Sequence, residues 1–400
     1  MIFVLLCQYC LTHEHFNTKM QTSKPMDYLS NLQGRVSADL AGKINKLEMM
    51  YSKKLWHQLT LELLEIVKEP FFQQGCQALE LYNSFISDFE NRINPLSLVE
   101  ICGIVMEQIV DVNDQISFIK KIETKVPSST EAKSLCRIFA GHRILHVLKD
   151  EAGAKKNIEE VEELLDSVDG VTPVHGRFYL LQSDLFRIQG KHAEYYRSAL
   201  RFLGCTDIST LSTEEAHTHA FLLGMAALLG EGVYNLGELL AHPVLETLRT
   251  TEKGWLIDVL FAFNSGNIAG FDKLRPFWST QADLVANERL LRQKLVLLAL
   301  MEMTFQRSAT QRLLTFTEIA NTTALPENEV ELLVMRALSQ ELLKGTIDQV
   351  AKTAHFTWVQ PRTLDKQQLG TMIERLHVWT QDISSMESLL ETKAHDILTF

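Results

Sequence analysis

Apolar side chains recur with a helical period along most of the chain, from about residue 46 to residue 305. The clearest case lies in residues 51–68, where apolar residues return every four positions and two more widen the same stripe: Leu55, Leu59, Leu63 and Val67, with Trp56 and Leu64. This spacing gives a helix one apolar face. Pro70 follows, and a proline cannot continue a helix.

Comparable stripes follow with only short breaks between them, in residues 79–89, 96–109, 116–126, 132–148 and 158–168. The breaks carry residues that stop and start helices: Asn94-Pro95, Pro127-Ser128-Ser129, Gly153 and Asp169-Gly170. Helices of this length joined by short turns stack as antiparallel pairs, and no single pair can bury a core alone. The sequence therefore predicts a mainly α, right-handed solenoid similar to tetratricopeptide arrays, although no strict repeat consensus is present.

Residues 176–203 continue the helical pattern with an aromatic-rich stripe, formed by Phe178, Tyr179, Tyr195, Tyr196 and Phe202. Aromatic residues spaced along helices form core packing far more often than a cofactor site. We therefore interpret this stripe as core.

The pattern changes near Thr315. Residues 315–320 predict a short helix, and residues 326–344 predict a second one, with Pro326 and an acidic residue in its first turn. The apolar face of this second helix is formed by Val330, Leu333, Val334 and Leu338. Gly345 is expected to end it.

Two short segments follow, residues 346–350 and 354–359, in which Phe356 and Trp358 alternate with Thr357. Alternation of this kind is typical of a half-exposed hairpin. Helix, turn, helix and a two-stranded wing is the order of a winged helix, which we expect over about residues 312–361.

Winged helices often bind DNA, but the charge of the expected recognition helix argues against that function. Residues 326–344 carry four acidic and two basic side chains: Glu327, Glu329, Glu331 and Glu341 against Arg336 and Lys344. A helix that reads a DNA groove needs the opposite balance. We interpret the wing as a protein-pairing element whose exposed strand edge could extend a neighbour's sheet.

The strongest single pattern lies at the C-terminus, where apolar residues alternate at steps of three and four: Leu369, Met372, Leu376, Trp379, Ile383, Met386 and Leu390. This spacing is a heptad seam. A helix from about residue 365 to residue 398 would be on the order of 50 Å long, more than a winged helix can cover. We expect it to join a bundle of several subunits, and the alternative is that it folds back on the chain's own solenoid.

Composition narrows the function further. The 400 residues are too many for one ordinary core, so two or three units or an elongated array are expected. The formal charge of −11 would repel a phosphate backbone or an anionic membrane surface. The six cysteines, Cys7, Cys10, Cys76, Cys102, Cys136 and Cys205, show no disulfide framework, which favours a reducing, intracellular compartment.

The first 30 residues differ from the rest. The apolar run of residues 1–6 is far shorter than the roughly 20 residues that span a bilayer, and it lacks the basic start and cleavage pattern of a secretory signal. We expect residues 1–30 to be a disordered tail or the product of a misassigned start, with Met26 as an alternative start. Cys7 and Cys10 form a CxxC spacing without further ligands, which we attribute to chance.

No catalytic motif is present in the sequence. There is no phosphate-binding Walker loop, no GxSxG elbow and no HExxH. His217 and His219 have the HxH spacing of a metal-dependent deubiquitinase, but the required Ser-x-x-Asp does not follow. Positions two apart on a helix also face different ways, so we expect surface histidines. No catalytic residue, cofactor or metal is expected.

Two weaker candidates have simpler explanations. Gly230-Glu231-Gly232 follows an apolar helical stripe and not the strand that precedes a phosphate loop, so a turn between helices is expected. Cys205 has His192 upstream but no third group to orient a thiol-imidazole pair. We expect a buried structural cysteine.

The order of helical repeats, winged helix and terminal bundle helix resembles the PCI-domain family, which is shared by the proteasome lid, the signalosome and a translation initiation complex. Longer stretches resemble the proteasome lid members of that family: KKLWHQLTLELLE (53–65), INPLSLVEI (93–101), YYRSALRFLGC (195–205), LLGEGVYNLGELLAHPVLETLR (228–249), WLIDVLFAFNSGNI (255–268), NEVELLVMRALS (328–339), TWVQP (357–361) and AHDILT (394–399). The similarity runs from about residue 47 to residue 399, and residues 1–25 depart from it.

The resemblance implies a non-catalytic subunit of the lid of the proteasome regulatory particle, found in cytoplasm and nucleus. Its implied partners are other PCI-containing lid subunits through the winged helix and the lid's helical bundle, including deubiquitinase-type subunits, through the last helix. No nucleic-acid or membrane partner is implied. The implied interface residues are Ile347, Val350, Phe356 and Trp358 in the wing, together with the seven residues of the C-terminal seam. A scaffold subunit of the signalosome or of the initiation complex is the alternative.

The expected domains follow from these boundaries. Helical repeats cover residues 31–193 and a PCI domain covers residues 194–361, with its helical part ending at about residue 305. The bundle helix covers residues 365–399.

Overall fold

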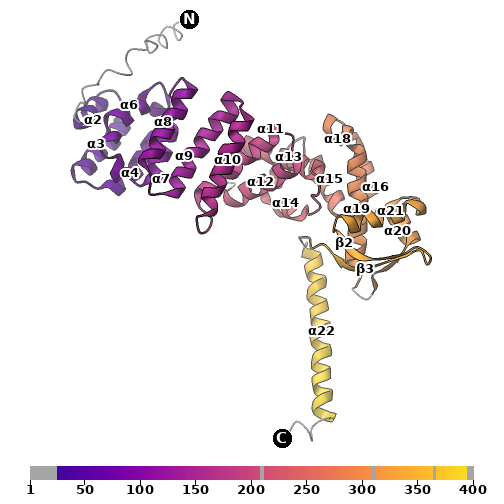
Figure 1. The fold of residues 1–400 in the computed structure, drawn as a ribbon. Helices are drawn as coiled ribbons and strands as arrows, with labels where there is room; N and C mark the ends of the chain where they lie inside the picture. Colours follow the sequence, from indigo (N-terminus) through magenta and orange to yellow (C-terminus); the bar gives the residue numbers. More distant parts are fainter. Residues whose placement is uncertain (1–24, 208–210, 309–310, 364–365, 394–400) are drawn as a thin grey trace. The chain divides into compact units, whose positions relative to one another are not determined.

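The computed structural model describes residues 25–207, 211–308, 311–363 and 366–393 (Figure 1). The chain divides into two compact units, residues 1–185 and residues 186–400. We predicted this boundary at residues 193 and 194, eight residues later. Within the described ranges, no helix is both long enough and apolar enough to cross a bilayer.

The described N-terminal unit is built from helices. Their bounds are α2 Pro25–Gln33, α3 Ala38–Ser52, α4 Trp56–Val67, α5 Pro70–Gln73, α6 Gln77–Ser84, η1 Ile86–Asp88, η2 Glu90–Arg92, α7 Pro95–Glu107, α8 Val112–Lys125, α9 Thr130–Arg143, η3 Ile144–Leu148, α10 Glu151–Asp166 and α11 Pro173–Ile188, which crosses into the second unit. Successive helices pack on one another, α8 on α9 and α9 on α10, as Figure 1 shows. The predicted helical-repeat architecture is therefore confirmed.

Two of the four predicted breaks coincide with helix caps. The Asn94 side chain accepts a hydrogen bond from the Leu96 amide, with Pro95 in the first turn, and Ser129 caps α9 through the Ala132 amide. Each cap satisfies an amide that has no partner inside its helix. Gly153 is an exception, because it lies inside α10 and its amide donates to Asp150 Oδ1 at 3.0 Å. Asp150 begins that helix, and our prediction of a break at Gly153 was wrong.

The buried face of α4 contains Leu59, Leu63 and Val67, as the stripe predicts. The stripe's first member, Leu55, is exposed because α4 begins only at Trp56. Lys54, just before it, has φ +57°, which separates α4 from α3. The aromatic residues predicted as core, apart from the partly buried Tyr179, are all buried.

The predicted disordered tail reaches too far. Pro25–Gln33 is a helix, and its buried residues Leu29 and Leu32 join the core of the N-terminal unit. Two leucines three positions apart lie on one helix face, so they pack together against α3. The remaining part of that prediction, residues 1–24, lies outside the described residues, as do Cys7 and Cys10.

The second unit begins with a further helical region. Its elements are α12 His192–Cys205, α13 Thr213–Leu229, α14 Gly237–Ala241, η5 Pro243–Thr250, α15 Trp255–Asn264, α16 Ile268–Lys273, α17 Arg275–Trp278, α18 Ala282–Ala286 and α19 Glu288–Gln306. A capping box starts α13, where Ser212 Oγ accepts from the Glu215 amide and Glu215 accepts from Ser212. These hydrogen bonds lower the pKa of Glu215.

A buried lysine ties α19 to the end of α13. Lys294 Nζ donates to three carbonyl oxygens, those of Ala227 at 2.6 Å, Leu228 at 3.2 Å and Gly230 at 3.0 Å. These carbonyls belong to the C-terminal end of α13 and the residues after it, where the helix leaves acceptors unpaired and its dipole favours a cation. Burial lowers the pKa of Lys294 to about 7, and the three acceptors offset part of that cost.

Lys294→Met is expected to lower the free energy of unfolding by about 1–3 kcal/mol, because buried acceptors lose their donor. Urea unfolding of the full chain measures this effect. Lys273→Met, at an exposed lysine on α16, is the matched control and should stay within about 0.5 kcal/mol. Equal stability of the two variants would show that these hydrogen bonds contribute nothing.

The winged helix is confirmed and has one strand more than predicted. Its elements are β1 Leu313–Thr315, α20 Phe316–Thr323, α21 Glu327–Ser339, β2 Leu343–Asp348 and β3 Thr353–Val359. The three strands form an antiparallel sheet in the order β1-β3-β2. Thr315 and Glu318 form a capping box at α20, and the Thr315 backbone and Arg307 hydrogen bonds lower the pKa of Glu318.

Gly345 lies in strand β2 and does not end the preceding helix. α21 ends at Ser339, and Glu341 with φ +57° turns the chain toward β2. Gly345 sits at an irregularity in the β2–β3 register, where a Cβ atom would lie 2.2 Å from the His355 carbonyl oxygen. The position needs glycine because the neighbouring backbone approaches so closely.

The last described element is α22, Lys366–Lys393, which has 28 residues. It confirms a long C-terminal helix. The prediction extended this helix from residue 365 to residue 398, and residues 364–365 and 394–400 lie outside the described residues.

Candidate assembly surfaces

The predicted C-terminal seam is exposed along its whole length. Its seven side chains have exposed fractions between 45% for Met372 and 66% for Met386, with Leu376 at 55%, Trp379 at 62% and Ile383 at 50%. An apolar stripe on a soluble helix is normally covered. None of these side chains is buried against the described part of the chain.

The segment just before α22 is fixed to the helical region by a buried ion pair. The Arg362 guanidinium contacts the Glu302 carboxylate of α19, and only 8% and 13% of these side chains are exposed. Arg362 also donates to the Asn264 carbonyl at 3.3 Å and lies over the Phe305 ring. This ion pair was not predicted from the sequence, because no local sequence pattern relates two residues that are 60 positions apart.

Thr363 adds a second attachment. Its amide donates to Asn235 Oδ1 at 3.3 Å, and its side chain packs on the start of α14. A Cβ atom on Gly237 would lie 2.6 Å from Thr363 Cβ, so a larger residue would displace this segment. The chain is thus attached to the helical region up to Thr363, three positions before α22 begins at Lys366.

The predicted wing residues have different environments. Val350 is 98% exposed at the hairpin turn, where Asp348 Oδ1 accepts from the Val350 and Ala351 amides. Trp358 is 37% exposed, with the Lys344 ammonium 5.1 Å from its ring centroid. Ile347 is half-buried.

Phe356 is only 1% exposed, so it belongs to the core of the winged helix and cannot contact a partner there. We predicted Phe356 and Trp358 on one exposed face by strict alternation. The β2–β3 register shifts between Lys344 and Gly345, the partners of Trp358 and Phe356, and this irregularity breaks the strict alternation.

One edge of the sheet is formed by β2. Among the described residues β2 pairs only with β3, so its other edge has no strand partner. Such an edge presents amides and carbonyls that can add a strand from another chain.

Two apolar residues on α21 were missed by sequence reasoning. Leu332 is 66% exposed and Met335 is 51% exposed, beside a buried face that contains Val330 and Val334. The sequence did contain a signal for these two residues, because both are apolar and lie outside the apolar stripe of α21. Together with Val350 they place exposed apolar side chains on the winged helix.

Two charged groups of α21 make contacts within the second unit. Glu327 pairs with Lys352 at 2.9 Å, and Arg336 donates to Gln293 Oε1 at 2.8 Å. This arrangement agrees with the unfavourable charge balance of the helix for DNA.

The structure also places the residues whose sequence pattern resembled a metal, phosphate or thiol site. His217 and His219 are on α13, and the His219 ring packs on Phe202 with centroids 5.5 Å apart. Residues 230–232 form the turn after α13, with Gly232 at φ +73°. Cys205 is exposed at the end of α12, so our prediction of a buried cysteine was wrong.

Comparison with known proteins identifies the family. Residues 43–260 match the family model described as PSD13 N-terminal repeats, and residues 272–358 match the PCI domain. The chain is 37% identical to the "26S proteasome non-ATPase regulatory subunit 13" of Dictyostelium discoideum, over 95% of this chain and 100% of that relative. The repeat match thus extends beyond residue 193, where we predicted the repeats to end.

Two further relatives agree. The "26S proteasome non-ATPase regulatory subunit 13 homolog B" of Arabidopsis thaliana is 34% identical over 93% of this chain and 99% of its own length. The "Probable 26S proteasome regulatory subunit rpn9" of Schizosaccharomyces pombe is 33% identical over 91% of this chain and 95% of its own length. This chain therefore belongs to the family of the 26S proteasome non-ATPase regulatory subunit 13.

Proposed function

We propose that this chain is a non-catalytic structural subunit of the lid of the proteasome regulatory particle, acting in the cytoplasm and nucleus. Its winged helix contacts other PCI-containing lid subunits. Its helix α22 enters the lid's helical bundle, which includes deubiquitinase-type subunits. The proposal extends the proteasome role named for the relatives to this chain.

The observation that carries the proposal is the uncovered seam of α22. Leu369, Leu376, Ile383 and Leu390 occupy one heptad position and Met372, Trp379 and Met386 the other. Full burial of one such side chain contributes about 1.5–3 kcal/mol. Seven of them, each about half exposed, are a large driving force for association.

The width of the apolar surface supports a multi-helix bundle and not a simple pair. Ile373 and Leu389 are also more than half exposed and occupy the two heptad positions that flank the seam. A two-stranded coiled coil needs only the two seam positions, whereas a helix in a bundle uses a wider face.

The winged helix supports contacts with sister subunits. Val350 at the hairpin turn, Leu332 and Met335 on α21, and the unpaired edge of β2 offer both apolar contact and strand addition. Trp358 and Ile347 flank this edge. Phe356 is left out of the proposed interface because it is buried.

Affinity purification of the full chain from cells, followed by mass spectrometry of the co-purifying proteins, tests which complex it joins. Subunits of the proteasome regulatory particle are the expected result. Recovery of signalosome or initiation-complex subunits in their place would contradict the proposal. The isolated chain is expected to show no hydrolase activity toward ubiquitin conjugates.

A nucleic-acid-binding function predicts steeply salt-dependent binding. We expect no shift of DNA or RNA by the full chain, even at low salt, because α21 carries excess negative charge. A salt-dependent shift that Arg336→Ala weakens would revive that function.

A further inference from the structure

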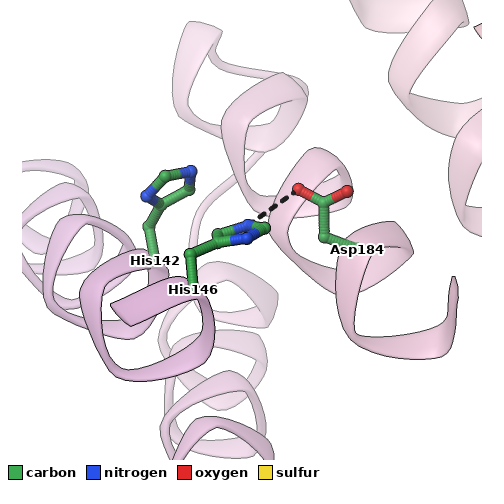
Figure 2. A group of neighbouring side chains, drawn as sticks. All are labelled: His142, His146 and Asp184. Atoms are coloured by element: carbon green, nitrogen blue, oxygen red, sulfur yellow. Dashed lines mark hydrogen bonds and ion pairs between the residues drawn. The ribbon is translucent and has the colours of Figure 1, made fainter. Parts of the chain in front are cut away.

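Three side chains with metal-binding atoms meet inside the N-terminal unit. His142 lies at the end of α9, His146 in η3 and Asp184 on α11 (Figure 2). One donor atom from each lies within 4.8 Å of the other two. Across the described residues, no other set of three histidine, cysteine or acidic side chains meets this condition.

The local helix geometry brings the two histidines together. Residues 144–148 form a π-helical turn that ends at Lys149 with φ +55°. His142 and His146 are one turn apart, and their ring centroids are 4.3 Å apart. Single π-turns are uncommon and occur frequently at functional sites.

Asp184 completes the group from a different helix. Its Oδ2 lies 3.2 Å from His146 Nε2, and Figure 2 shows the His146 ring directed toward this carboxylate, with His142 beside it. Two ligands bound at 2.0–2.2 Å to a tetrahedral zinc ion are about 3.3–3.6 Å apart. The pair therefore already has nearly the separation that a shared ion needs.

The surroundings of the group also suit a metal. The His142 ring is exposed, and Arg143 is the next residue in the chain. Arg143 itself pairs with Glu107 at 3.2 Å, which balances part of its charge. Exposed fractions of 30% for His146 and 15% for Asp184 leave a path for an ion.

We propose that His142, His146 and Asp184 bind one zinc ion, with water as the fourth ligand. The ion would join η3 to α11 and so fix the packing of two helices that are close in space but about 40 residues apart in sequence. Two imidazoles and one carboxylate suit zinc and related divalent ions. The site is structural, and it does not depend on the function proposed above.

Cobalt titration of the full chain, prepared without a histidine tag, tests the site. Co²⁺ in a tetrahedral site gives visible absorption, and zinc should displace it because zinc binds such ligands more tightly. We expect one cobalt ion per chain, loss of its absorption on adding zinc, and a melting temperature several degrees higher with zinc than with EDTA.

Asp184→Asn keeps the shape of the side chain and removes its charge, so it separates metal binding from folding. We expect Asp184→Asn, His142→Ala and His146→Ala each to weaken cobalt binding by more than about 10-fold, the least that loss of a supporting group costs in metal sites. His57→Ala, at an exposed histidine on α4, is the matched control and should bind cobalt like the unmodified chain.

Two results would overturn the proposal. One is cobalt binding by Asp184→Asn that equals binding by the unmodified chain, with both proteins equally folded in EDTA. The other is a near-ultraviolet thiolate-to-cobalt band that Cys7→Ser removes, because the bound ion would then be held by cysteine.

Discussion

A chain that ends at residue 365 is expected to fold and yet fail to enter the proteasome regulatory particle. The deletion removes all of α22 and, with it, the seven apolar side chains of the seam. None of these residues is buried in the described core, so the deletion leaves that core intact. Co-purification of the truncated chain with other lid subunits measures the effect.

The expected loss is large because association through α22 is driven by apolar burial. Each seam residue is about half exposed and would gain about half of the roughly 1.5–3 kcal/mol that full burial contributes. A change of 1.4 kcal/mol corresponds to about tenfold in affinity. The wing surface alone should therefore retain only weak binding.

Substitutions on α22 distinguish the contribution of the seam to association from that of the helix as a whole. Three acidic substitutions in the seam, Leu376→Glu, Trp379→Glu and Ile383→Glu, are expected to lower the affinity by more than about 1,000-fold, since each costs at least one tenfold step of 1.4 kcal/mol. The matched control has the same added charge on the opposite face: Gln381→Glu, Ser384→Glu and Ser388→Glu. Undiminished incorporation of the seam variant would exclude the seam as an assembly surface.

Arg362→Met is expected to lower the free energy of unfolding by about 3–5 kcal/mol, the range for removing one partner of a buried ion pair. The cost arises because Glu302, with 13% of its side chain exposed, would keep its charge without a counterion. Denaturant unfolding of the full chain measures it. The substitution also releases the segment before α22, so incorporation into the particle should fall along with stability.

A double variant distinguishes a lost ion pair from lost packing. Arg362→Met combined with Glu302→Leu removes both charges, and it should recover most of the stability lost by the single variant. Arg362→Lys keeps the charge but not the second hydrogen bond to Asn264, so it should lie between them. If the double variant is as unstable as the single one, the buried charge is not the cause.

Periodicity predicted the helical repeats well because helix formation and burial use the same local pattern. Leu59, Leu63 and Val67 recur every four residues and are all buried. The order of helices and strands in the winged helix could be predicted for the same reason. The apolar seam of α22 was also visible in the sequence as a heptad repeat. Leu376 and Ile383, two of its members, are exposed in the structure.

The features that escaped prediction depend on residues far apart in sequence. Strand β1 pairs with β3 about 40 positions later, and a shift in the β2–β3 register separates buried Phe356 from exposed Trp358. Arg362 contacts Glu302, and Asp184 contacts His146. Both contacts arise from tertiary packing, which no local sequence pattern predicts. Gly345 was misread because glycine ends helices and also permits close strand contacts.

Hydrogen exchange of the backbone amides of residues 366–393 tests the central claim most directly. An isolated helix without tertiary packing is only marginally stable, so its amides should exchange rapidly in the free chain. In the assembled particle the same amides should exchange slower by orders of magnitude, because partner helices cover the seam. Equal rates in the two states, or slow exchange already in the free chain, would contradict α22 as the helix that this subunit contributes to the bundle.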